Sequence, residues 1–166
     1  MSKRWFIALV FTVIAGTFIA PQRSGAEVQC PWLNSATAGG VLGGEVQENV
    51  TALTPQGDTT CDFRRTEHSG VSSLTIAVHT MATPAKDFAS YLAGCAGTKV
   101  PLKAIGNEAV QCVQSNGSAE ELIIGRVRDR AFILDIKRSA IGQRTSASGL
   151  SEEARNMAEQ VAGALF

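Results

Sequence analysis

The chain has 166 residues, with 15 basic and 15 acidic side chains, so its formal net charge is zero at pH 7. This balance gives no reason to expect nucleic acid or an acidic membrane as a partner, because both attract strongly basic proteins. The length suits one domain that buries a hydrophobic core. We therefore expect one folded unit and take its segments in chain order.

The first 26 residues have the three-part layout of a secretory signal peptide. A basic start, Met1–Arg4, precedes an apolar run, Trp5–Ala20, and a polar segment that ends in the small residues Ser24-Gly25-Ala26. The apolar run is short for a membrane-spanning helix, which needs about 20 residues. We predict cleavage after Ala26 and export of residues 27–166 as a single domain, with an uncleaved N-terminal anchor as the alternative.

Leu92-Ala93-Gly94-Cys95 matches the sequence motif of a bacterial lipobox, but the motif lies in the middle of the chain. A lipobox is processed only beside the signal segment, and Cys95 lies far downstream of it. The cysteine nearest to the signal is Cys30, and the preceding Glu27 and Gln29 are not the aliphatic and small residues that lipidation requires. We therefore predict an exported protein without a lipid anchor.

Four cysteines lie in the predicted exported part: Cys30, Cys61, Cys95 and Cys112. An even number in an oxidising compartment indicates two disulfides, and four cysteines allow three pairings. We favour Cys30–Cys61 with Cys95–Cys112, because sequential pairing closes the shorter loops and ties each flanking helix to a strand. A zinc site is the competing use, but the chain has no C-x-x-C and neither histidine is spaced to join a cysteine pair. We predict no metal and no cofactor.

Two short helices are predicted in the first part of the chain. Asn34 is a good N-cap and Gly43-Gly44 a good stop for a helix over residues 34–42. Thr83 caps a second helix, and Pro84 suits its first position. The inner face of this second helix carries three residues at helical spacing: Phe88, Leu92 and Cys95.

A third helix is predicted over residues 151–166, with Ser151 as its cap. Glu152 and Glu153 suit the positive start of a helix. Its apolar stripe has a period of about 3.6 residues and consists of Ala154, Met157, Ala158, Val161 and Leu165. The Ser- and Gly-rich residues 139–149 before it are predicted to form a surface loop.

Strand patterns are found between the helices, at residues 46–53, 59–65, 71–80 and 109–114. The third is the clearest, because apolar residues alternate with polar ones as in a half-buried strand. This strand, over residues 71–80, is therefore expected to be half-buried.

Residues 121–138 predict a β-hairpin. With Val127 facing Phe132, one sheet face is wholly apolar, and on the other face Arg126 lies diagonal to Asp135 and can pair with it. Together the chain has three predicted helices and about five strands, joined by hairpins rather than by βαβ units. The predicted fold class is α+β with an antiparallel sheet and two disulfides.

No catalytic residue can be assigned from the sequence. His79 lies on the polar face of its strand, and His68 lies in a predicted turn. A Ser-His-Asp group has no nucleophile-elbow motif to support it. The paired glycines at 39–40 and 43–44 lack the Lys-Ser/Thr that completes a phosphate loop.

Basic residues gather around the hairpin: Arg126, Arg128, Arg130, Lys137, Arg138 and Arg144. Strand alternation places Arg126 and Arg128 on the same face. One interpretation is a surface of Arg126, Arg128 and Arg130 that binds an anion or a partner, such as a cell-envelope component or another protein. The other is a charged solvent face that protects the hairpin from aggregation.

Several motifs follow one another in a characteristic order: Cys30-Pro-Trp-Leu33, Ala36-Thr-Ala-Gly-Gly-Val-Leu-Gly-Gly44, Cys61-Asp-Phe63, Leu74-Thr-Ile-Ala-Val78 and Ile105-Gly-Asn-Glu-Ala109. With the basic hairpin and the last helix, this order resembles a family of exported bacterial domains of unknown function, abundant in actinobacterial cell-envelope lipoproteins. It is also similar in layout to extracytoplasmic sensor domains of receptor kinases. The resemblance implies an α+β fold with two disulfides and no established activity. The family's lipobox is missing here, so membrane attachment is not carried over.

Two function classes follow from the sequence. The first is a non-catalytic exported module that binds a ligand or partner at the cell envelope, and this is our prediction. The second is a small exported hydrolase whose site the sequence does not reveal. A deep pocket where His79 meets serine and aspartate side chains would favour the hydrolase.

Overall fold

The computed structural model describes residues 28–52, 55, 57–68, 70–113, 120–139 and 147–166; the predicted signal peptide lies outside them. In chain order the elements are α1 (Ser35–Leu42), β1 (Gln47–Ala52), β2 (Thr59–Glu67), β3 (Gly70–Thr80), α2 (Pro84–Ala93), β4 (Thr98–Leu102), β5 (Glu108–Val113), β6 (Glu120–Val127), β7 (Arg130–Lys137) and α3 (Ala147–Ala164). The predicted α+β class, with three helices in the described residues, is confirmed.

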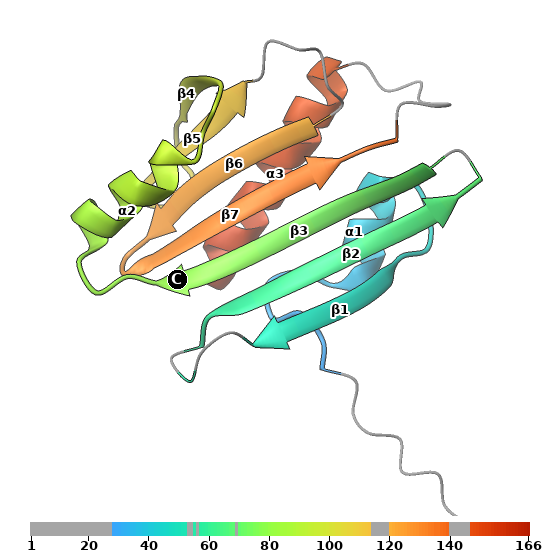
Figure 1. Ribbon diagram of the computed structural model, residues 1–166, viewed down its shortest axis with the longest axis horizontal. Coiled ribbons are helices and arrows are strands. Elements are labelled where there is room, and N and C mark those ends of the chain that lie inside the picture. The colour runs from blue at the N-terminus through green and yellow to red at the C-terminus, as the bar shows by residue number, and fades with distance from the viewer. Residues whose placement is uncertain (1–27, 53–54, 56, 69, 114–119, 140–146) are drawn as a thin grey trace, which may run out of the picture.

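The strands of the described residues form one antiparallel sheet of seven, in the order β1-β2-β3-β7-β6-β5-β4 (Figure 1). The prediction of about five strands is therefore wrong. The sequence pattern does not reveal β4, because Pro101 lies within it and proline is depleted in strands. Strand β4 pairs only with β5 at the edge of the sheet, where a residue without an N–H can be accommodated.

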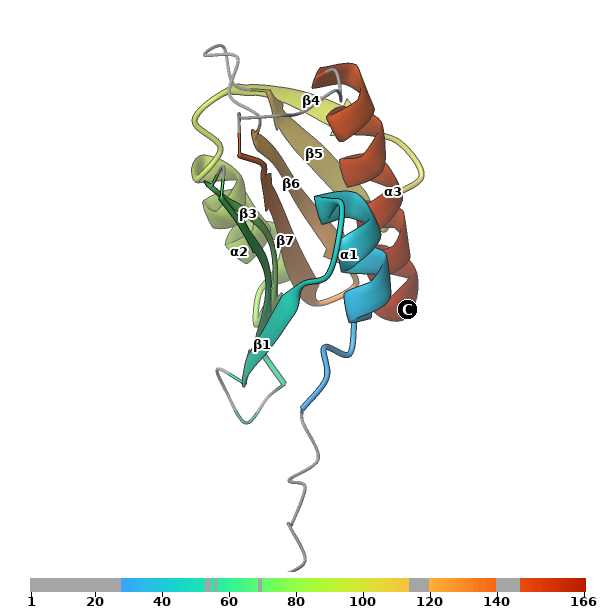
Figure 2. The ribbon, with the colours of Figure 1, turned by 90° about the vertical axis from the view of Figure 1, so that its right-hand side faces the viewer.

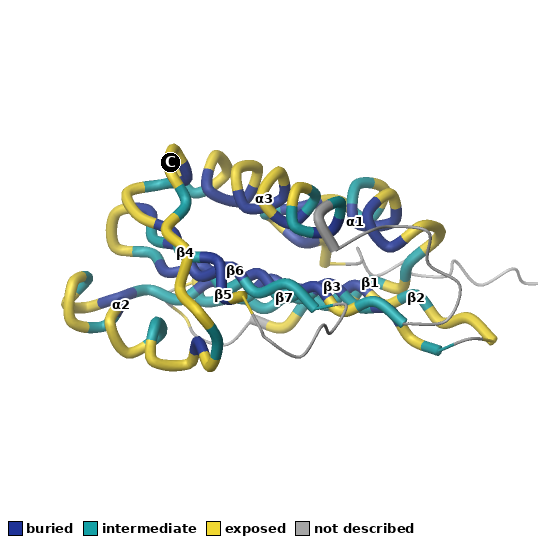
Figure 3. Tube along the Cα trace, turned by 90° about the horizontal axis from the view of Figure 1, so that it is seen from above, coloured by how far each residue is buried: buried dark blue, intermediate teal, exposed yellow. Residues whose placement is uncertain are grey.

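The two faces of the sheet are covered differently (Figures 2 and 3). Helices α1 and α3 pack on one face, and α2 packs on the other face against β6 and β7. The larger core lies under α1 and α3, and alternate residues of β3 fill part of it: Leu74, Ile76 and Val78. A smaller core lies under α2 and consists of Met81, Phe88, Cys95, Cys112, Ile124 and Ala131. We call the two sides the α1–α3 face and the α2 face.

One of the predicted helix caps is wrong. Helix α3 begins at Ala147, so Ser151 lies inside it, and its Oγ is 2.7 Å from Nε2 of Gln111 on β5. The serine therefore joins the helix to a buried polar side chain of the sheet. Helix α2 begins at Pro84 with Thr83 at its N-cap position, as predicted, although the side chain of Thr83 makes no capping hydrogen bond.

The β6–β7 hairpin forms two residues out of the predicted register. Gly125 rather than Val127 faces Phe132, and Val127 faces Arg130. A slip of two residues keeps every side chain on its predicted face, so the apolar face is intact. The pairing is close, because a Cβ on Gly125 would lie 2.2 Å from the ring of Phe132.

The loop before β5 holds the turn of this hairpin. Asn107 donates its N–H to the carbonyl oxygen of Arg126 at 2.8 Å, and its Oδ1 accepts from the N–H of Arg128 at 2.6 Å. Arg128 has φ 54, the left-handed conformation that a tight turn requires. Gly106 has φ 59, and a Cβ there would lie 2.4 Å from the same carbonyl oxygen, so glycine is needed. A distant loop therefore sets the register.

Candidate binding site

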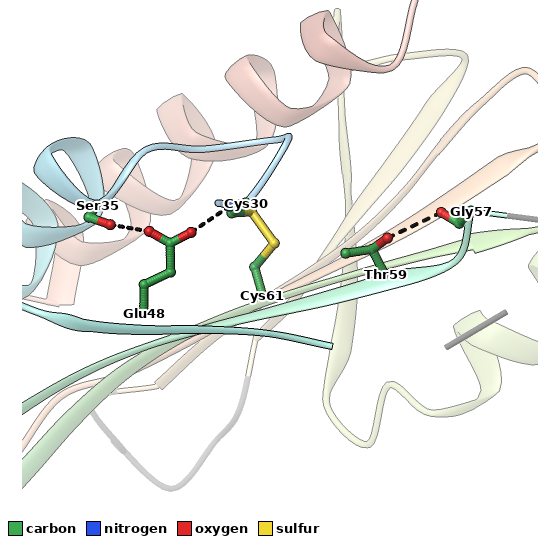
Figure 4. Close-up of a disulfide and its surroundings, with 6 residues drawn as sticks. All are labelled: Cys30, Ser35, Glu48, Gly57, Thr59 and Cys61. Atoms are coloured by element: carbon green, nitrogen blue, oxygen red, sulfur yellow. Dashed lines mark hydrogen bonds between the residues drawn. A yellow bond between two sulfur atoms is a disulfide. The ribbon is translucent and has the colours of Figure 1, made fainter. Parts of the chain in front are cut away.

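Both predicted disulfides are present. The Cα atoms of Cys30 and Cys61 are 5.7 Å apart, and those of Cys95 and Cys112 are 5.6 Å apart, within the usual range for a disulfide. The first bond joins the segment before α1 to β2 on the α1–α3 face (Figure 4). The second joins the segment after α2 to β5 on the α2 face. Each disulfide thus ties a helix-flanking segment to a strand, as expected.

The side chains of Arg126 and Arg128 contact different aromatic rings, although Nη1 of Arg126 also donates to the carbonyl oxygen of Arg128 at 3.3 Å. Nε of Arg126 lies 2.7 Å from Oε1 of Glu108, and its guanidinium lies over the ring of Phe88 on α2, 6.0 Å from the ring centre. Arg128 lies in the turn beyond β6, so strand alternation does not extend to it. Its guanidinium lies 5.8 Å from the ring centre of Phe166, which follows α3. The two side chains therefore contact opposite faces of the molecule.

Arg130 contacts a third segment. Its Nη1 donates to the carbonyl oxygen of Gly57, 3.4 Å away, in the connection between β1 and β2. The three arginines of the predicted binding surface thus contact α2, the C-terminal residue and the β1–β2 connection.

The predicted pair between Arg126 and Asp135 does not form, because Arg126 pairs with Glu108 and Asp135 with Lys137. Oδ2 of Asp135 accepts from Nζ of Lys137 at 2.8 Å, and the same nitrogen lies 3.0 Å from Oε1 of Glu120. Hydrogen bonds to these two carboxylates raise the pKa of Lys137. Arg144, the last basic residue of the group, lies outside the described residues.

Three titratable side chains meet near the end of β3. Nδ1 of His79 lies 3.7 Å from Oδ2 of Asp58, and the His79 ring is stacked on Tyr91 of α2 with 5.4 Å between ring centres. Burial acts to raise the pKa of Asp58, but hydrogen bonds from the backbone and side chain of Thr80 and the charge of His79 lower it below its ordinary value. Burial and the carboxylates of Asp58 and Asp87 raise the pKa of Tyr91.

This cluster holds elements together. Oδ1 of Asp58 accepts from the N–H of Thr80 at 2.7 Å, which ties the start of β2 to the end of β3. In the described part of the chain, no group of three His, Cys, Asp or Glu side chains is placed to hold a metal ion. His68 lies exposed in the turn after β2, as predicted.

A groove runs along α1 and the start of β1. Its larger part has a volume of ≈ 590 Å³ and is lined by Ser35, Ala36, Gly39, Gly40, Gly43, Gly44, Glu45 and Val46. A second part of ≈ 380 Å³ is lined by Gln29, Ser35, Val46, Gln47 and Glu48. Because the two parts share Ser35 and Val46, we treat them as one surface and call it the α1–β1 groove.

The glycines of α1 shape this groove. A Cβ on Gly39 would lie 2.6 Å from the carbonyl oxygen of Gly44, so these two residues pack backbone against backbone. A Cβ on Gly40 would meet no atom within 4 Å, so this position opens into free space. In the sequence, the glycine pairs indicate only a helix stop and an incomplete phosphate loop. Their spacing was the one available signal for the groove.

Contacts from other elements hold α1 in place. A short helix with two glycines has little helix propensity of its own. Asn34 caps its start, as predicted. At its end, Nη1 of Arg65 donates to the carbonyl oxygen of Leu42 at 2.7 Å, and the buried Arg138 donates to that of Val41. Both guanidinium groups satisfy carbonyls that lack partners within the helix and lie at its negative end.

Glu48 holds the other end of α1. Its carboxylate points from β1 between two segments and accepts from the hydroxyl of Ser35 and the N–H of Cys30 (Figure 4). Cys30 is in turn bonded to Cys61 of β2. Helix α1, which forms one wall of the groove, is therefore fixed at both ends.

No protein-family model, curated protein or solved structure matches this chain. The resemblance to exported cell-envelope domains therefore stays a prediction from the order of motifs. Among the helices of the described residues, none is both long enough and apolar enough to cross a membrane.

Proposed function

We propose that this chain is an exported, non-catalytic module of the cell envelope that binds a ligand or partner protein in the α1–β1 groove. The observation that carries the proposal is the groove itself, held open beside a helix that is fixed at both ends. Binding sites are concave, largely preformed and lined by a few polar groups. A preformed site also loses less conformational entropy on binding.

Export is supported by two independent features. Disulfides persist in oxidising compartments, and the structure has two of them. The first 26 residues have the charge and hydropathy pattern of a secretory signal. The proposed partner is an envelope component or another protein rather than nucleic acid. We further propose that the exported protein carries no lipid anchor.

Gly40 allows a test that leaves the fold intact. A side chain at Gly40 meets no atom within 4 Å, and leucine is a better helix former than glycine by up to about 1 kcal/mol. Gly40→Leu should therefore fill the groove without destabilising the protein. Gly163 on α3 has equally open surroundings, so Gly163→Leu is the matched control.

The two variants and the native protein are compared in binding to three probes: displayed random peptides, soluble fragments of cell-wall polymer and anionic lipid vesicles. We expect at least one probe to bind the native protein and Gly163→Leu equally. The same probe should bind Gly40→Leu about tenfold more weakly or worse, a loss of about 1.4 kcal/mol. If every probe that binds is insensitive to Gly40→Leu, the groove is not the binding site and the proposal fails.

A small exported hydrolase is the second candidate, and the approach of Asp58 to His79 favours it. A carboxylate that orients a histidine is part of many acid–base sites. Hydrolysis of p-nitrophenyl esters by the native protein, His79→Ala and the exposed control His68→Ala decides between the two. Turnover that disappears only in His79→Ala would establish the hydrolase. A native protein without turnover of these esters would count against it.

A further inference from the structure

We infer that the occupant of the α1–β1 groove is an extended, basic peptide segment of another protein, which adds to the sheet as a further strand along β1. The inference rests on the proposed function, because it names the partner class for the same groove. It follows from the two edges of the sheet, from the position of the groove beside one of them, and from the residues that line it.

The two edges differ in their ability to accept a strand. Strand β4 carries Pro101, which has no N–H, and Lys99, which places a charge on the edge. Both are devices that block pairing at a sheet edge. Strand β1 has the sequence QENVTA, so each of its residues keeps an N–H and none is a lysine. Within the described residues, the backbone of β1 pairs only with β2, which leaves its outer edge available.

The groove lies beside this available edge. Val46, Gln47 and Glu48 line it, and β1 begins at Gln47. Side chains of an extended strand alternate between the two faces of a sheet. Every second side chain of a strand added to β1 therefore points to the α1–α3 face, toward the groove. In such strand addition the main-chain hydrogen bonds supply affinity and the pocket selects the side chain.

The lining of the groove indicates the side chains of the partner. Ala36 and Gly40 leave space for a bulky apolar group. Among the described lining residues, the charged ones are Glu45 and Glu48, and both are acidic. The carboxylate of Glu48 is already hydrogen-bonded within the protein, whereas Glu45 is exposed. A peptide with lysine or arginine near its apolar residue is therefore complementary in charge.

The probe is a synthetic peptide of alternating lysine and valine with a central phenylalanine, about ten residues long. Replacing one backbone N–H at a time by N-methyl removes one hydrogen bond of a paired strand. In a strand that pairs on one edge, only the N–H groups of alternate residues point toward the partner strand. We therefore expect binding to fall about tenfold or more when N-methyl is placed at every second position, and at those positions only. A scan without this alternation would overturn strand addition.

The charge complementarity between Glu45 and the basic peptide is tested by substitutions in the protein. Glu45→Lys should weaken binding of the same peptide about tenfold, and the affinity of the native protein should fall as salt screens the attraction. Glu152→Lys changes an exposed acid on α3 by the same amount and is the control that should bind normally. Equal binding by Glu45→Lys and Glu152→Lys would overturn the predicted charge of the partner.

The outcomes separate this inference from the function on which it rests. If Gly40→Leu abolishes peptide binding but the N-methyl scan shows no alternation, the groove stands as a binding site and strand addition fails. If a polymer fragment or vesicle binds in a Gly40-dependent way and the peptide does not, only the peptide inference fails. If no probe depends on Gly40, both fail. A native dimer whose β1 amides are protected from exchange without peptide would assign the edge to a second copy instead.

Discussion

Helices α2 and α3 are held on opposite faces of one sheet by different means. Among its residues of described burial, 149–164, helix α3 buries six side chains: Leu150, Ala154, Met157, Ala158, Val161 and Ala162. Helix α2 buries only Phe88, and just beyond its end Cys95 is bonded to Cys112 of β5. Apolar burial fixes α3, whereas α2 packs on a smaller core and a covalent bond limits how far it can move from the sheet.

The largest expected effect comes from one substitution made on each face. Phe132 is fully buried on the α1–α3 face, and Phe88 is 2% exposed on the α2 face. Phe→Ala in a core costs about 3–5 kcal/mol, and less where the surroundings can close the cavity. We expect Phe132→Ala near the top of this range and Phe88→Ala near the bottom, because α2 can settle toward the sheet. Denaturant unfolding measures both, and equal losses would contradict the comparison.

Removing each disulfide in turn tests whether α2 depends on its cross-link more than α3 does. Loop-closure entropy assigns about 3 kcal/mol to a bond that spans 17 residues and somewhat more to one that spans 31. We expect Cys95→Ala/Cys112→Ala to speed hydrogen exchange of the α2 amides while those of α3 keep their protection. The matched Cys30→Ala/Cys61→Ala variant should loosen α1 instead. If exchange in the first variant rises equally in α2 and α3, the view that α2 depends on its cross-link is wrong.

The contrast also shows what local sequence can predict. Period-two and period-3.6 patterns, with short loops between cysteines, were enough for the α+β class, the helices and both disulfides. Strand β4 was not predicted, because it forms through its pairing with β5 despite the poor strand propensity of Pro101. The hairpin slipped from its predicted register because Asn107, well before it in the chain, binds both sides of the turn.

The candidate site was harder to predict for the same reason. Arg126 and Arg128 are close in sequence, but their ring partners, Phe88 and Phe166, come from distant segments on opposite faces. The α1–β1 groove depends on Arg65 and Arg138, which cap a helix far from them in the chain. Charge clustering along a sequence therefore said little about which charges are available to a ligand.

Acid should weaken one anchor of the α2 face. Because the pKa of Asp58 lies below its ordinary value of 3.8 in the folded protein, the carboxylate stabilises the fold above that pH. This contribution is lost as pH falls through the lower pKa of the folded state. We expect Asp58→Asn to cost about 1 kcal/mol at pH 7 and progressively less in acid. Unfolding free energies across this pH range measure the effect. A cost that does not shrink in acid, or an equal cost for the exposed control Asp129→Asn, would contradict it.

The smallest expected effect sharpens the assignment of partners across the hairpin. Arg126 pairs with Glu108 in the structure, whereas the sequence-based register pairs it with Asp135. Exposed ion pairs couple by about 0.2–1 kcal/mol, so a double-mutant cycle of Arg126→Ala with Glu108→Ala should give a coupling in this range. The cycle with Asp135→Ala should give a coupling near zero. Arg126→Ala alone also removes the contact with Phe88. The cycle is needed because this loss occurs both with and without the second substitution, so it cancels from the coupling energy. A stronger coupling to Asp135 than to Glu108 would return the hairpin to the register that its own pattern suggests.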